Sequence, residues 1–144
     1  MAKHRKNKRI AIVAHDSRKK DMAEWVAFNR KKLREYQLVC TGTTGKMVED
    51  TLNPLSHGEV SMEFPIIKLK SGPLGGDQQL GAMISEGKID IMIFFWDPMQ
   101  PQPHDVDVKA LLRITALYNI PTATNRSTAD FIISSPLFEG HYEP

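Results

Sequence analysis

Short apolar runs alternate with amphipathic stretches along the chain. The run at 10–14 is almost wholly apolar and does not alternate with polar residues, which is typical of a strand that is buried on both faces of a parallel sheet. Four further runs are interpreted as strands, of which 66–69 is the weakest. The predicted strands are 10–14, 36–40, 66–69, 89–95 and 120–124. Between and after them, apolar residues recur at a helical spacing. They predict helices over 19–34, 46–52, 80–86, 106–118 and from Ser127 or Thr128 to 133.

This regular alternation of strand and helix predicts an α/β fold with a single domain. We expect a doubly wound parallel five-stranded sheet flanked by helices, which 144 residues can form with one core. We assign residues 9–144 to the domain and residues 1–8 to a basic flexible tail. The segment Asn53–Pro65 is rich in turn formers and is interpreted as an irregular extension.

Composition narrows the class of protein. A hydrophobic content of 41% with 25% charged residues is ordinary for a folded globular chain and excludes a disordered one. The basic run at the start lacks aromatic residues and a recognition helix, so no nucleic-acid partner is expected. No apolar run approaches the length of a membrane span, so no membrane partner is expected either. The single Cys40 excludes an intrachain disulfide, fits a reducing cytoplasm and is interpreted as a small buried hydrophobe.

The carboxyl ends of the predicted strands carry most of the unusual polar residues. Those ends read His15–Asp16, Thr41–Gly45, Ser71–Asp77, Asp97–Asp107 and Asn125. In a doubly wound sheet these ends share one edge, and ligands bind just beyond it. The sequence therefore predicts one site at this edge.

Thr41–Gly45 has the composition of an anion site. Its hydroxyls, its glycine backbone and the start of the next helix suit a phosphate, although ordinary helix capping explains the segment equally well. Lys19 follows His15 by about one helical turn and can add a positive charge, and Ser71–Gly72 adds another hydroxyl and amide. No P-loop or dinucleotide fingerprint is present, so a small phosphoester is favoured over a nucleotide.

The same edge holds the candidate acid–base groups. They are Asp16, Asp77, Asp97, Asp107, His15 and His104. Asp77 follows a glycine-rich segment at a helix start, where an isolated aspartate is most often a cap. A metal is the rival use of these side chains, but the chain has no HExxH, paired cysteines or EF-hand loop, so no metal is predicted. The absence of a G-x-S-x-G elbow disfavours a serine hydrolase.

Six separated segments together resemble the methylglyoxal synthase family. They are 13–16, 41–45, 71–79, 94–98, 103–113 and 123–125, in the family's order. The resemblance implies a carbon–oxygen lyase of a glycolytic bypass that converts dihydroxyacetone phosphate to methylglyoxal and inorganic phosphate through an enediol(ate), without a cofactor. It also implies a homohexamer, with inorganic phosphate as product and inhibitor.

The resemblance further implies roles for individual residues. Asp77 corresponds to the general base and His104 to the group that polarises the substrate carbonyl. His15 belongs to the substrate site, and Asp16 and Asp107 are the accompanying active-site carboxylates. The residues that correspond to the phosphate site are Lys19, Thr41, Thr43, Thr44, Ser71 and Gly72. The segment Asn53–Pro65 is longer than the family pattern.

Two alternatives share these features. A non-catalytic regulatory module, similar to the allosteric domain of the large chain of carbamoyl phosphate synthetase, would use the threonines and the lysine. It would have no use for a base at Asp77 or for His104, so the enzyme is favoured. A phosphatase would release phosphate from the same substrate but would leave dihydroxyacetone.

Overall fold

A computed structural model describes residues 8–53, 66–100, 105–140 and 142. Parts of two predicted segments, the basic tail and the Asn53–Pro65 extension, lie outside these residues, as does His104. Lys8 is the first described residue. Its ammonium donates hydrogen bonds to the carbonyl oxygens of Phe138, at 2.5 Å, and Gly140, at 3.1 Å.

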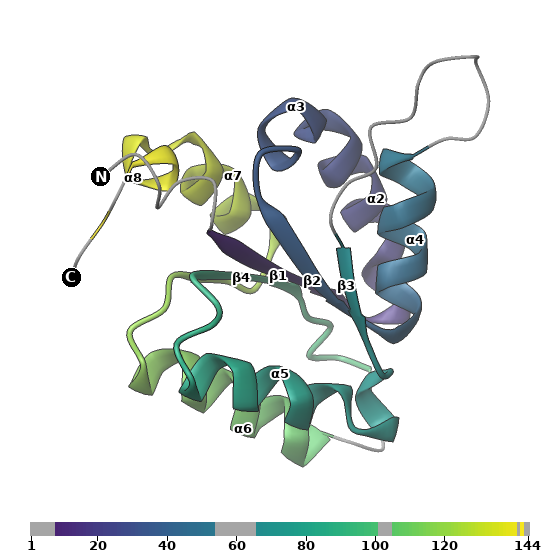
Figure 1. Cartoon of the computed structure of the whole chain (residues 1–144). Helices are drawn as coiled ribbons and strands as arrows, with labels where there is room; N and C mark the ends of the chain where they lie inside the picture. Colours follow the sequence, from purple (N-terminus) through teal and green to yellow (C-terminus); the bar gives the residue numbers. More distant parts are fainter. Residues whose placement is uncertain (1–7, 54–65, 101–104, 141, 143–144) are drawn as a thin grey trace.

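The described strands form one parallel sheet (Figure 1). The strands are β1 (Arg9–Ala14), β2 (Gln37–Thr41), β3 (Ile66–Leu69), β4 (Ile91–Phe95) and β5 (Thr122–Ala123). Their order is β3-β2-β1-β4-β5, and every neighbouring pair is parallel. The prediction of a five-stranded parallel sheet is therefore confirmed. The chain winds from the central β1 first to one side and later to the other, so the topological switch lies between β1 and β4.

Helices cover both faces of the sheet (Figure 1). On one face lie α2 (Lys19–Phe28), α3 (Arg30–Leu33), α4 (Gly42–Leu52), α7 (Arg126–Ser134) and α8 (Pro136–Glu139). On the other lie α5 (Gly76–Ser85) and α6 (Asp105–Leu117). Two short 3₁₀ turns, η1 (Asp16–Arg18) and η2 (Gly72–Leu74), follow β1 and β3. Among the described residues, no helix combines the length and the apolar character that a membrane crossing requires.

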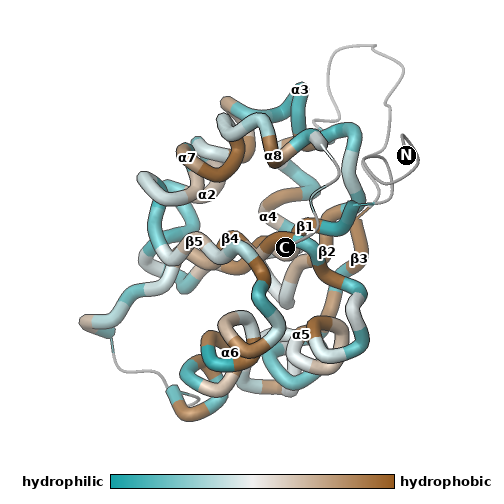
Figure 2. The backbone as a smooth tube through the Cα atoms, turned by 90° about the vertical axis from the view of Figure 1, so that its left-hand side faces the viewer, coloured by the Kyte–Doolittle hydropathy of each residue, from teal (hydrophilic) through white to brown (hydrophobic). Residues whose placement is uncertain are grey.

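The two cores follow from the alternation of side chains along each strand. In β1, Ile10 and Ile12 pack with Trp25 of α2, whereas Ala11 and Val13 pack on the opposite face beneath α5 and α6. Figure 2 shows the strands as mostly hydrophobic segments between helices of mixed hydropathy. A central strand buried on both faces must be apolar throughout, which explains the unbroken runs in the sequence.

Cys40 of β2 is fully buried in the core shared with α2 and α4. Burial raises the pKa of its thiol to about 12, because a thiolate would lose its hydration there. The interpretation of Cys40 as a small buried hydrophobe is confirmed.

The helix predicted over 19–34 is interrupted at Asn29. The side-chain amide of Asn29 donates to the carbonyl oxygen of Trp25 at 2.8 Å, and its backbone N–H donates to the same oxygen at 3.1 Å. With ψ at 18° the residue leaves the helical conformation, so α2 ends at Phe28 and α3 begins at Arg30. A buried asparagine can offer the backbone this alternative partner, which apolar spacing alone cannot indicate.

The prediction that the helix after β2 begins at Lys46 is wrong, because α4 begins at Gly42. Glycine and threonine are poor helix formers, and the prediction followed that propensity. In the structure, tertiary contacts override it. The N–H of Gly42 donates to the carbonyl oxygen of Lys70 at 3.1 Å, and the hydroxyl of Thr44 bonds to the backbone of Ala14. Thr43 and Thr44 consequently lie in the first helical turn.

The last helix also begins earlier than predicted. Asn125 is its N-cap and accepts a hydrogen bond from the N–H of Thr128 at 2.9 Å, so Ser127 and Thr128 are inside the helix. An asparagine at this position is as good a cap as serine or threonine. β4 and β5 are shorter than predicted, since pairing starts at Ile91 and at Thr122.

The glycine-rich segment between β3 and α5 folds tightly onto itself. The N–H of Gly76 donates to the carbonyl oxygen of Ser71 at 2.9 Å, and Gly75 has φ of +109°. A Cβ on Gly76 would lie 1.9 Å from the carbonyl oxygen of Lys70. Since that obstacle is backbone, only glycine fits at this position.

We predict that Gly76→Ala lowers the free energy of unfolding by about 1–3 kcal/mol or more, as overpacking does. Gly81→Ala in the same helix is the matched control, since its Cβ would meet the side chain of Ile114 at an ordinary 3.6 Å. The control should leave the free energy unchanged or raise it by up to about 1 kcal/mol. Urea unfolding midpoints measure both, and a Gly76→Ala protein as stable as the parent would contradict the prediction.

Candidate functional site

A pocket of about 250 Å³ opens at the carboxyl edge of the sheet, beside the ends of β1, β2 and β3. Most of the predicted site residues line it, namely His15, Asp16, Lys19, Thr41, Thr43, Thr44, Ser71, Gly72 and Asp77. The space is smaller than the pockets of roughly 300–1,000 Å³ that hold drug-sized molecules. The prediction that these strand ends converge is confirmed, and the size suits a ligand of a few heavy atoms.

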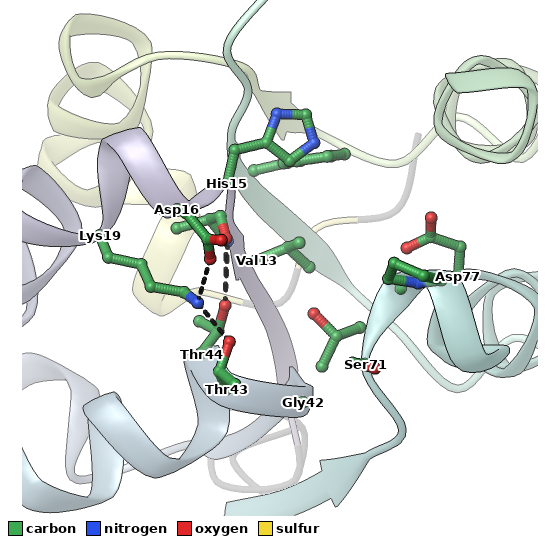
Figure 3. Close-up of a pocket in the computed structure, with 14 residues that line it drawn as sticks. Val13, His15, Asp16, Lys19, Gly42, Thr43, Thr44, Ser71 and Asp77 are labelled. Carbon is green, nitrogen blue, oxygen red and sulfur yellow. Dashed lines mark hydrogen bonds and ion pairs between the residues drawn. The ribbon is translucent and has the colours of Figure 1, made fainter. Parts of the chain in front are cut away.

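Lys19 supplies the positive charge of the pocket (Figure 3). It is the first residue of α2, and its ammonium donates to the carboxylate of Asp16 at 2.6 Å and to the hydroxyl of Thr43. The hydrogen bond from Lys19 lowers the pKa of the largely exposed Asp16 carboxyl, so this group is ionised at neutral pH. Asp16 thus holds the lysine at the pocket, where a bound anion could also accept from it.

The start of α4 adds backbone donors. The first four N–H groups of a helix have no acceptor within that helix, and they form its positive end. The hydroxyl of Thr44 is committed elsewhere, because it accepts from the N–H of Ala14 and donates to the carbonyl oxygen of the same residue, both at 3.3 Å. Thr44 therefore anchors the helix start to β1, while the exposed Thr43 presents its hydroxyl beside Lys19.

The segments Thr41–Gly45 and Ser71–Gly72 meet at one wall of the pocket. A Cβ on Gly42, which has φ of +32°, would lie only 2.5 Å from the Cα of Ser71. Any larger residue at 42 would push the Ser71–Gly72 backbone away from the start of α4. The contact explains how the two predicted phosphate-binding segments form a single wall.

Asp77 lies across the pocket from Lys19 and Thr43 (Figure 3). It occupies the first turn of α5 and is only 5% exposed. The N-cap position of α5 is Gly75, so Asp77 is not the cap residue. A nearly buried carboxylate in a pocket of this size faces whatever ligand the pocket holds, as a proton-transfer group must.

His15 completes the pocket at the end of β1. It is 7% exposed, and its ring packs edge-on against Phe94 with centroids 5.2 Å apart. Its Nδ1 accepts a hydrogen bond from the N–H of Asp97 at 3.0 Å. Phe94 also lines the pocket. It lies in one of the segments that resemble the family, but no role was predicted for it because it belongs to an apolar strand.

Three of the remaining predicted residues, Asp97, Asp107 and Asn125, are described and do not line this pocket. Asp107 is half-buried in the first turn of α6, and Asn125 caps α7. Asp97 is half-buried, and hydrogen bonds from the Ser17 hydroxyl and from the N–H of Met99 lower the pKa of its carboxyl. His104 precedes α6 and is not among the described residues. Within the described ranges, no group of three His, Cys, Asp or Glu side chains is arranged to hold a metal ion.

Comparison with known proteins gives the class and then the family. Residues 21–124 match the family model of the MGS-like domain. The methylglyoxal synthase of Maridesulfovibrio salexigens is 62% identical over 141 residues, covering 96% of this chain and 90% of that protein. The methylglyoxal synthase of Leptospira interrogans is 54% identical over 136 residues, covering 94% of this chain and 85% of that protein.

A solved structure agrees with these relatives. The crystal structure of methylglyoxal synthase from Elizabethkingia anophelis NUHP1 has a TM-score of 0.82 and 48% sequence identity, covering 95% of this chain and 84% of that chain. The chain belongs to the methylglyoxal synthase family. The named relatives are lyases, so the prediction of a lyase of this fold is confirmed.

We predict that Lys19→Met weakens binding of inorganic phosphate roughly tenfold, as expected for a charged hydrogen-bond donor. The same change should raise the pKa of Asp16 toward its ordinary value, because the lysine now lowers it. Calorimetric titration with phosphate and a ¹³C carboxyl NMR titration measure the two effects. Lys20→Met is the matched control, since Lys20 is exposed and does not line the pocket. Equal phosphate affinity in both variants would remove Lys19 from the anion site.

Proposed function

We propose that this protein converts dihydroxyacetone phosphate to methylglyoxal and inorganic phosphate, with Asp77 as the general base. One observation carries the assignment of roles. A nearly buried carboxylate and a lysine–threonine group line opposite sides of one small pocket (Figure 3). A three-carbon phosphate can present its phosphate to one side and its hydroxymethyl carbon to the other.

The phosphate group binds at the start of α4. Lys19 and Thr43 donate from one side, and the helix start and the Ser71–Gly72 backbone donate from the other. Thr41 and Thr44 belong to the same wall, and the contact of Thr44 with Ala14 fixes the position of the donors. Because these groups are held before the substrate arrives, little ordering is needed on binding.

Asp77 removes a proton from the hydroxymethyl carbon, C3. The electrons of that C–H bond form the C2–C3 double bond of an enediolate, and negative charge develops on the C2 oxygen. Such an oxygen needs donors placed in advance, and His15 and His104 fill that role. Asp16, which lines the pocket, acts as an accompanying carboxylate of the site. The family resemblance gives Asp107 the same role, although Asp107 does not line the pocket that the described residues form.

The bond to the phosphate breaks next. A proton first passes from the C3 hydroxyl to the C2 oxygen, with His104 assisting its movement. The C2=C3 electrons then form a C1=C2 double bond as phosphate leaves C1, and C3 becomes the aldehyde carbon. The resulting enol takes up a proton at C1, loses the one on its C2 oxygen, and so tautomerises to methylglyoxal. This elimination is fastest when the C1–O bond stands perpendicular to the enediolate plane. An isomerase holds that bond near the plane, so that the intermediate is reprotonated. The angle at which the anion site holds the phosphate group therefore selects the product. Released inorganic phosphate binds to the same donors and so inhibits the enzyme.

The decisive experiment incubates the purified protein with dihydroxyacetone phosphate in the presence of EDTA and identifies the carbon product. Methylglyoxal is expected. Dihydroxyacetone would indicate a phosphatase, and an unchanged substrate that nevertheless binds would indicate a regulatory module.

We predict that Asp77→Asn lowers kcat by a factor on the order of 10²–10⁴, the usual contribution of a general base. Phosphate affinity should stay close to that of the parent, because the anion site is on the other side of the pocket. Asp50→Asn is the control, since Asp50 is exposed on α4 and does not line the pocket. Exchange of C3 hydrogen with solvent, followed by NMR, separates proton removal from elimination. Near-normal exchange by Asp77→Asn would exclude Asp77 as the base.

We also propose a homohexamer. Several large apolar side chains are exposed on the described surface, among them Phe28 at 85% and Phe131 at 80%, which supports contacts with further copies. Light scattering during size-exclusion chromatography should give six times the 16.3 kDa chain mass. A monomer at micromolar concentration would contradict this assembly.

A further inference from the structure

Three hydrogen bonds join the loops that follow β1 and β4. The N–H of His15 donates to the carbonyl oxygen of Phe95 at 3.1 Å. The N–H of Asp97 donates to Nδ1 of His15 at 3.0 Å. The hydroxyl of Ser17 donates to Oδ2 of Asp97 at 2.5 Å. The two loops are thus connected along their length, beyond the last residue pair of the strands.

The hydrogen bond from the N–H of Asp97 to Nδ1 of His15 replaces a backbone hydrogen bond of the β1–β4 ladder. The last pair of the β1–β4 ladder is Ala14 with Phe95, and the next rung of a parallel ladder would run from the N–H of Asp97 to the carbonyl oxygen of His15. That carbonyl instead accepts from the N–H of Arg18 at 2.8 Å, where η1 begins. The imidazole Nδ1 has replaced the backbone carbonyl as the acceptor for Asp97.

This contact determines where the imidazole carries its proton. A ring nitrogen that accepts from an N–H cannot itself bear hydrogen, so the proton of the neutral ring lies on Nε2. Protonation of Nδ1 would set two N–H groups against each other. The edge-on contact with Phe94 and the burial of the ring keep His15 in this orientation.

The carboxylate of Asp97 accepts two hydrogen bonds that fix the orientation of this residue, and with it the direction of its backbone N–H. Oδ1 accepts from the N–H of Met99 at 3.0 Å, while Oδ2 accepts from Ser17. The carboxylate therefore closes a turn on its own strand and also reaches across to the turn after β1. Of these two hydrogen bonds to the Asp97 carboxylate, the one from Ser17 comes from the loop after β1. It therefore helps to set the position of Asp97 relative to His15.

The charged groups around His15 come from η1, α2, α5 and the loop after β4. Asp16 and Arg18 lie in η1, Lys19 begins α2, and Asp77 lines the same pocket from α5. Asp97 follows β4. The carboxylates of Asp16 and Asp97 interact with His15 in the sense that favours an imidazolium. The backbone N–H of Asp97, which donates to Nδ1 at 3.0 Å, opposes this effect because it leaves no room for a proton on Nδ1.

We propose that Ser17 and Asp97 are positioning residues that hold His15 as a neutral imidazole with its proton on Nε2. Given the proposed function, the pocket then presents an uncharged donor to the substrate oxygen. A neutral imidazole stabilises a developing enediolate by a hydrogen bond from Nε2–H and keeps its proton more firmly than an imidazolium would.

The first test needs no turnover. Protein labelled with ¹⁵N at histidine is examined by NMR at neutral pH, and the His15 signals are identified by their loss in His15→Gln. The expected result is a non-protonated Nδ1 and a protonated Nε2. In Ser17→Ala the two nitrogens should move toward a mixture of tautomers or toward the cation. A protonated Nδ1 in the parent, or an unchanged spectrum in Ser17→Ala, would overturn the proposal.

The second test asks whether Ser17 acts through His15. Ser17→Ala should lower kcat/KM roughly three- to tenfold, the effect of losing one ordinary hydrogen bond. Ser17→Thr, which keeps the hydroxyl, should have a kcat/KM close to that of the parent. In the His15→Gln background the same substitution should have no further effect, since the residue it positions is gone. An equal loss in both backgrounds would mean a merely structural role and would overturn the proposal.

Two controls keep the outcomes distinct. Ser134→Ala removes a hydroxyl that donates to the carbonyl of Asp130 on α7, away from the pocket, and should match the parent in kcat/KM and in the His15 spectrum. Circular dichroism establishes that each variant is folded. If dihydroxyacetone phosphate is not converted, the proposed function fails, while the spectrum of His15 still decides the proposal about Ser17 and Asp97.

Discussion

The parallel pairing of β1 with both β2 and β4 is the constraint on which the site depends. Because parallel strands end at the same edge, three loops that are far apart in the sequence are brought together beyond Ala14, Thr41 and Phe95. Each loop contributes a different chemistry. The β1 loop brings a histidine and a lysine, the β2 loop brings a helix start, and the β4 loop fixes the histidine. A shift of one residue in either register would point these groups away from each other.

Close backbone approach turns this edge into a pocket. Gly42 lies against Ser71, and Gly76 lies against Lys70, so the loops after β2 and β3 behave as one rigid wall. Thr44 fastens that wall to β1. Preorganised donors of this kind are effective because they need not reorient as charge develops on a substrate. The buried residues of the wall set the geometry, and the side chains of Lys19 and Thr43 carry the contacts.

Most of the fold could be predicted from the sequence because both faces of the sheet are covered. The central strands β1 and β4 therefore read as nearly unbroken apolar runs, and the alternation of apolar runs with helical spacing predicted all five strands. The break at Asn29 was missed because apolar spacing continues through it, although its hydrogen bond to Trp25 is local. The early start of α4 at Gly42 could not be predicted, since it depends on the backbone of Lys70 and Ala14 and local propensity opposed it.

The site, like the fold, was predicted in part. Strand ends predicted which residues converge, because topology alone brings them to one edge. The partners of His15 were not predictable, since the contact with Asp97 depends on how two turns leave their strands. Asp97 was a candidate acid–base group, yet in the structure its carboxylate accepts from Ser17 and Met99 outside the pocket.

The burial of Cys40 has a consequence for durability during catalysis. The proposed product is an α-oxoaldehyde, an electrophile that modifies thiolates, and it would be released next to the end of the strand that holds this cysteine. The only sulfhydryl of the chain is sealed in the core with a pKa of about 12, so almost none of it is in the nucleophilic form. The catalyst is thereby protected at this position from self-inactivation by its own toxic aldehyde.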